Sequence, residues 1–121
     1  MKIGIFSDIH DRTNHLEQAM HRMLRLGCGH FIFLGDCTTP ESFRRLLELA
    51  QGLPLDAVPG NNDYDLLAMH QMAAASPAAR LHPELAVITR YRMKLSLSHY
   101  PRYAWQEAVS YTHLRAHETP E

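Results

Sequence analysis

The chain has 121 residues, with 12 basic and 13 acidic side chains, a formal net charge of −1, and 45% hydrophobic residues. This length predicts one domain, and the balanced charge argues against a nucleic-acid or membrane surface. No apolar run approaches the roughly 20 residues that a membrane-spanning helix needs, and the two cysteines do not suggest a disulfide framework, so we expect a reduced, cytoplasmic protein.

Strands and helices are expected to alternate along the chain. Short, continuous apolar runs predict buried strands, whereas apolar residues spaced three and four apart predict helices. Gly27 is expected to end the first helix, Thr39-Pro40 to begin the second, and residues 89–92 to form a hairpin turn. The expected strands are residues 2–7, 30–34 and 55–58 with two more between 84 and 97, and the helices lie within 13–27, 40–50 and 64–75. This alternation is typical of an α/β fold with a parallel sheet.

Polar side chains with metal-ligand chemistry follow these apolar segments. Because the carboxyl ends of parallel strands meet at one edge of a sheet, we expect these side chains to converge there. Carboxylate and imidazole groups together suit Mn²⁺, Fe²⁺, Ni²⁺ or Zn²⁺ better than Ca²⁺. Taken singly, each motif also has a plainer structural interpretation, as a helix cap, a turn residue or a buried histidine. In chain order the side chains are Asp8, His10, Asp36, Asn61, Asn62, Asp63 and His99.

The order of these motifs resembles the metallophosphoesterase (calcineurin-like phosphoesterase) family, in its small bacterial and archaeal phosphodiesterase-like subgroup. The family signature reads D-x-H, G-D, G-N-[HCN]-[DE], H and G-H-x-H, and the first four motifs are present between residues 8 and 99. The resemblance implies the N-terminal part of a metallophosphoesterase α/β sandwich. It also implies two divalent metal ions, with Mn²⁺ expected first and Ni²⁺, Fe²⁺ or Zn²⁺ as alternatives. The implied ligands are Asp8 and His10 for one metal, Asn61 and His99 for the other, and Asp36 for both.

Two positions near the motifs depart from the family pattern. Asn62 stands where the family commonly has a His that assists the leaving group, and because Asn is no acid, poor leaving groups are expected to be cleaved slowly. Tyr100-Pro101 follows His99 in place of the usual Gly, which changes the local turn. The resemblance further implies that Asp63 holds a neighbouring His through a hydrogen bond.

The C-terminal residues look foreign to the rest of the chain. Residues 109–118 read VSYTHLRAHE, which is one translated frame of a transposon-end sequencing adapter. We therefore expect residues 109–121 to be a non-native tail and residues 1–108 to be an incomplete phosphoesterase domain that lacks the G-H-x-H motif. The i, i+4 pair His113 and His117 belongs to this tail, so we do not interpret it as a zinc site. The tail is expected to form an extension or an unsupported helix, with the family's second sheet largely absent.

The expected function is phosphodiesterase-like, metal-dependent hydrolysis of a small phosphoester by the full-length protein, with the 121-residue chain itself inactive. The alternative is a non-catalytic protein-interaction module on the same fold. The ligand set through His99 argues against that alternative, whereas Asn62 leaves it open. The sequence specifies neither the substrate nor the oligomeric state, and it predicts no nucleic-acid or membrane partner.

Overall fold

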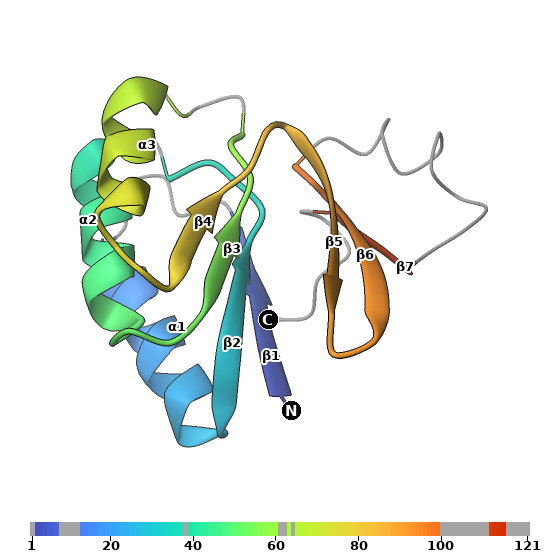
Figure 1. Cartoon of the computed structure of the whole chain (residues 1–121). Coiled ribbons are helices and arrows are strands. Elements are labelled where there is room, and N and C mark those ends of the chain that lie inside the picture. The colour runs from blue at the N-terminus through green and yellow to red at the C-terminus, as the bar shows by residue number, and fades with distance from the viewer. Residues whose placement is uncertain are drawn as a thin grey trace.

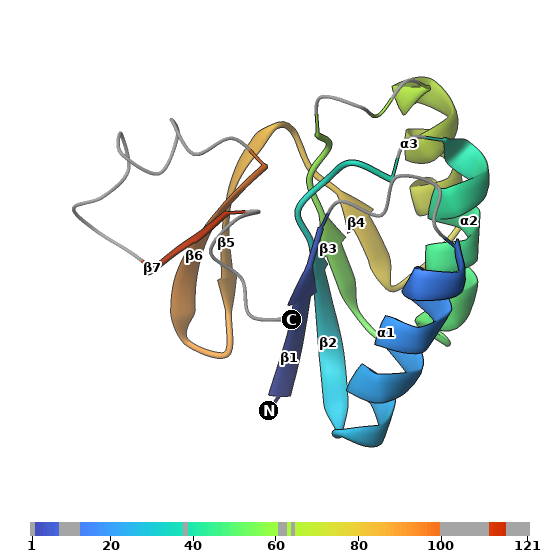
Figure 2. The same ribbon diagram turned by 180° about the vertical axis from the view of Figure 1, so that it is seen from behind.

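The protein is described by a computed structural model that covers residues 2–7, 13–37, 39–60, 63, 65–99 and 112–115. Its described part has three layers: a layer of helices, a parallel sheet, and a second, smaller sheet (Figure 1). The helices cover one face of the parallel sheet and the second sheet lies on the other side, as the view from behind also shows (Figure 2). No helix in these ranges is long and apolar enough to cross a membrane.

The first sheet is parallel throughout, with the strand order β1-β2-β3-β4. Phe33, the last residue of β2, pairs with Phe6 of β1 and with Ala57 of β3, so these three strands end at the same level. This alignment brings the loops that follow the strands to one edge of the sheet. The strands are β1 (Lys2–Phe6), β2 (Cys28–Phe33), β3 (Leu55–Ala57) and β4 (Ala79–Leu81).

Three helices connect these strands: α1 (Thr13–Arg25), α2 (Pro40–Leu49) and α3 (Leu66–Ala74). The predicted start of α2 is confirmed, because Thr39 Oγ1 accepts a hydrogen bond from the Ser42 N–H at 3.4 Å and Pro40 occupies the first turn. Gly27 follows α1 with a φ of 88°, the left-handed conformation expected of a glycine that ends a helix. The core between helices and sheet contains Leu16, Met20, Phe31, Phe33, Phe43, Leu46, Leu55 and Met69, all buried.

The second sheet contains the predicted hairpin, formed by β5 (Leu85–Arg90) and β6 (Met93–Ser98). Tyr91 and Arg92 make its turn, with positive φ angles of 51° and 65°. The hairpin packs on the face of the first sheet that the helices leave uncovered. The apolar layer between the two sheets comprises Ile32, Leu34, Val58, Ala86, Ile88, Leu95 and Leu97, with Ile3 and Ile5 at its margin.

Two strands were not predicted from the sequence. β4 has only three residues, and its short segment carries too little periodicity to reveal a strand that pairs with β3. The expectation that the tail is an extension or an unsupported helix is wrong at Thr112–Arg115, because these residues form β7, which is supported by parallel pairing with β6. The prediction that the second sheet would be largely absent is also wrong, since three strands form it. An edge strand presents unpaired backbone groups, and these attract any extended segment that reaches them.

Candidate metal centre

Asp36 lies just beyond β2, where the chain turns sharply. Gly35 and Asp36 have φ angles of 96° and 71°, so two consecutive residues adopt the left-handed conformation. A Cβ on Gly35 would lie 2.5 Å from the backbone N of Gly60, and a Cβ on Gly60 would lie 2.7 Å from the backbone N of Asp36. The loops after β2 and β3 therefore touch through their backbones, which only glycine permits at both positions.

The Asp63 carboxylate holds these two loops together. Its Oδ2 accepts hydrogen bonds from the backbone N–H of Asp36 at 2.9 Å and of Gly60 at 2.6 Å, and its Oδ1 accepts one from the backbone N–H of Cys37 at 2.8 Å. The Cys37 thiol donates to the same Oδ1 at 3.1 Å. Because Asp63 is only 8% exposed, these short bonds satisfy a buried charge with backbone donors. The sequence pattern pointed to Asp63 but carried no sign of these partners, since backbone N–H groups have no residue identity.

His99 comes directly after β6 and reaches from the second sheet to the first. Its Nδ1 donates to the backbone oxygen of Leu34 at 2.8 Å, since a carbonyl can only accept. In the neutral ring Nε2 therefore carries a lone pair, and this atom lies 3.4 Å from Asp36 Oδ2. Both side chains are buried, with 8% of His99 and 3% of Asp36 exposed. A proton or a metal cation placed between these two atoms would interact favourably with both.

The pair formed by Asp36 and His99 fits a metal ion. Ligand atoms about 2.0–2.2 Å from one ion are separated from each other by roughly 3–3.5 Å, close to the distance observed here. A metal-binding His also usually donates its other ring N–H to a carbonyl or carboxylate, as His99 does to Leu34. Within the described ranges no group of three or more His, Cys, Asp or Glu side chains could hold a metal. The other predicted site residues, Asp8, His10, Asn61 and Asn62, lie outside those ranges, as do Tyr100 and Pro101.

The family model of the calcineurin-like phosphoesterase superfamily domain matches residues 1–121. The chain belongs to this superfamily. The family resemblance inferred from the order of the ligand motifs is thereby confirmed. A comparison with curated proteins finds no match to the chain.

Several solved structures share this fold, among them those of two phosphoesterases. An archaeal phosphodiesterase is 20% identical to this chain in sequence and superposes with a TM-score of 0.78. The match covers 89% of this chain and 65% of the phosphodiesterase. The E. coli phosphoesterase Yfce is 22% identical with a TM-score of 0.63, and the match covers 84% of this chain and 59% of Yfce. A Thermus thermophilus protein is 15% identical with a TM-score of 0.62, and the match covers 93% of this chain and 65% of that protein. At these identities the likeness concerns the fold, and it confirms the expected N-terminal part of the α/β sandwich. The chain spans less than two thirds of each neighbour's length.

Proposed function

We propose that this chain is part of a metal-dependent phosphoric ester hydrolase that acts on small phosphodiesters or activated aryl esters. The observation that carries the proposal is the buried contact between Asp36 and His99, which joins the two sheets at the strand ends with a separation of 3.4 Å. Membership of the calcineurin-like phosphoesterase superfamily supports the same reaction class.

The metal centre would contain two divalent ions, with Mn²⁺ as the first candidate. We assign Asp8 and His10 to one ion, Asn61 and His99 to the other, and Asp36 to both. When bound, such ions activate water and neutralise charge that develops on a phosphoryl group.

The remaining roles belong to the protein's own groups. Asp63 holds the loops after β2 and β3 in contact through three backbone N–H groups, which keeps Asp36 in its left-handed conformation. Leu34 orients the imidazole of His99 through its carbonyl oxygen. Asn62 has no proton to give as an acid, so the reaction depends on a leaving group that departs unaided. Activated esters are therefore the preferred substrates.

We also propose that residues 109–121 are not native and that the 121-residue chain is inactive. The G-H-x-H motif would supply one further ligand to each metal, and without it neither ion has a complete set of protein ligands. A chain that continues with natural residues after position 108 is the form in which activity is expected.

The test is hydrolysis of a chromogenic phosphodiester by this longer chain with Mn²⁺, Ni²⁺, Fe²⁺ or Zn²⁺. Turnover that requires the metal and is lost in Asp36→Asn and His99→Gln is the expected result. Glu41→Gln is the matched control, because Glu41 makes a surface ion pair with Arg44 on α2. Absence of turnover with every metal and every ester would refute the proposal and favour a non-catalytic interaction module on this fold.

A further inference from the structure

A second group of polar side chains lies between the two sheets, centred on Asp56 of β3. Asp56 is 2% exposed, and its carboxylate accepts hydrogen bonds from three side chains. His30 Nε2 lies 2.7 Å from Oδ2 and His82 Nε2 lies 2.7 Å from Oδ1. Arg90 donates from Nε at 3.1 Å and from Nη2 at 2.8 Å, one bond to each carboxylate oxygen. The cluster therefore joins β2, β3, the residue after β4, and the end of β5.

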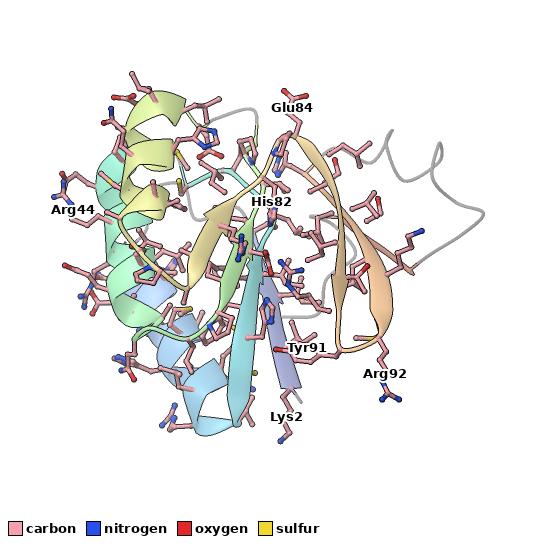
Figure 3. All side chains as sticks on the ribbon, in the orientation of Figure 1. Lys2, Arg44, His82, Glu84, Tyr91 and Arg92 are labelled. Atoms are coloured by element: carbon pink, nitrogen blue, oxygen red, sulfur yellow. The ribbon has the colours of Figure 1, made fainter. Side chains whose placement is uncertain are left out.

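Tyr91 extends this Asp56 cluster into the hairpin turn. Its hydroxyl lies 2.8 Å from His30 Nδ1, so the imidazole is bonded at both ring nitrogens. Figure 3 shows Tyr91 reaching from the turn back toward the first sheet, whereas Arg92 points away from it. Both residues have positive φ, a conformation that residues other than Gly, Asn and Asp adopt rarely. An unfavourable turn conformation is retained where contacts outside the turn stabilise it. Here the contacts of Arg90 with Asp56 and of Tyr91 with His30 provide that stabilisation.

The Asp56 cluster has the electrostatics of a stable ion pair. Burial alone would raise the pKa of Asp56, but the hydrogen bonds from His30, His82 and Arg90 and the charge of Arg90 outweigh burial and hold that pKa well below its usual range. The carboxylate is therefore charged at neutral pH, and the guanidinium of Arg90 compensates it.

The cluster extends from Asp56, which is level with Ile32 in the middle of β2, to the hairpin turn, whereas the proposed metal centre lies at the strand ends. His30 is near the start of β2 and Asp36 follows its end, so the two are six positions apart, or up to about 20 Å at roughly 3.3 Å per residue. Along β6 the same six positions separate Met93, beside the turn, from His99. The seven buried apolar residues of the inter-sheet core belong to the same layer. Apolar contacts are not directional, so they bring the two sheets together without specifying the position of the second sheet along the strands of the first.

We propose that the Asp56 cluster is a positioning device that specifies the register of the second sheet on the first and thereby the placement of His99 against Asp36. The consequence for metal binding rests on the function proposed above, whereas the effect on sheet placement does not. Buried ionic groups are best known for this kind of contribution, in which they specify one arrangement among several of similar stability. Within the part of the chain that the structure describes, the side-chain partners of His30, His82, Arg90 and Tyr91 belong to the Asp56 cluster itself, so these residues act as positioning groups.

The test replaces Arg90 by Met in the 121-residue chain and measures two quantities. The first is the NMR signal of the His99 imidazole without metal, which reports its surroundings directly. The second is the Mn²⁺ dissociation constant from calorimetry. We expect Arg90→Met to shift the His99 signal and to weaken Mn²⁺ binding about 10–100-fold, the range for groups that orient metal ligands. Leu46→Ala is the control, because it destabilises the core on the helix side and leaves the inter-sheet layer intact.

An unchanged His99 signal in Arg90→Met, or an equal shift in Leu46→Ala, would overturn the proposal. If Arg90→Met fails to fold, Tyr91→Phe removes only the hydroxyl that contacts His30 and is expected to move the same His99 signal by less; no shift in Tyr91→Phe would overturn the proposal as well. If the wild-type 121-residue chain binds no Mn²⁺, its incomplete ligand set accounts for that result, and the NMR comparison alone decides the role of the Asp56 cluster.

Discussion

Replacing Asp63 by Asn tests how the two loops of the proposed metal centre are joined. The amide keeps the size of the carboxylate but has only one acceptor oxygen. Its best orientation keeps that oxygen at the position of Oδ2, where it accepts from Asp36 and Gly60, and turns the NH₂ group toward the N–H of Cys37. One buried backbone donor then faces another donor.

The expected loss follows from these contacts. Leaving one buried donor unsatisfied costs about 1–3 kcal/mol, and hydrogen bonds to a neutral acceptor are weaker than those to a charged one. We therefore expect Asp63→Asn to lower the free energy of unfolding by about 2–4 kcal/mol, a large share of the roughly 5–15 kcal/mol of a typical domain. Urea unfolding measures this difference.

Asp65→Asn is the matched control, two positions further along the chain. Asp65 is exposed and caps α3, with Oδ1 accepting from the Ala68 N–H at 3.1 Å. Asn and Asp are comparable at this capping position, so we expect a change within about 0.5 kcal/mol. Equal losses in the two variants, or a loss below about 1 kcal/mol in Asp63→Asn, would refute the reasoning.

Further predictions concern the metal centre and the Asp56 cluster. Gly60→Ala should weaken Mn²⁺ binding in calorimetry, because the added Cβ would displace Asp36; unchanged affinity would contradict the contact between the loops. His99→Gln should likewise weaken Mn²⁺ binding. If the variant and the wild type bind Mn²⁺ with equal affinity, His99 is not a metal ligand. Since the folded-state pKa of Asp56 is lowered from 3.8, its contribution to stability is present above about pH 4 and is lost as the pH falls toward the folded value. The stability difference between wild type and Asp56→Asn should therefore be constant at neutral pH and shrink in acid, as measured by urea unfolding at each pH. Replacing residues 109–121 by the natural continuation should raise the stoichiometry and affinity of Mn²⁺ binding. Equal stoichiometry and affinity in the two chains would contradict the proposal that residues 109–121 are not native.

Much of the described architecture follows from local properties of the chain. Apolar periodicity, the cap at Thr39 and the glycine after α1 each act within a few residues, so the α/β alternation and the hairpin were predictable. The positions of the candidate ligand motifs at strand ends could be predicted for the same reason, because each motif follows a recognisable apolar segment. Two of these motifs contribute Asp36 and His99, whose side chains lie 3.4 Å apart.

Other features depend on contacts between distant segments. β4 and β7 have few residues and become strands because the edges of β3 and β6 offer them backbone partners. Asp56 sits in a short buried strand, and nothing in the sequence links it to Arg90, which is 34 positions away. Asp63 bonds to backbone N–H groups that any residue would supply. The sequence alone thus determined which side chains are candidate metal ligands, whereas the tertiary structure decided how backbone donors and a buried ion pair join distant segments, because those interactions depend on packing between segments and leave no periodic trace.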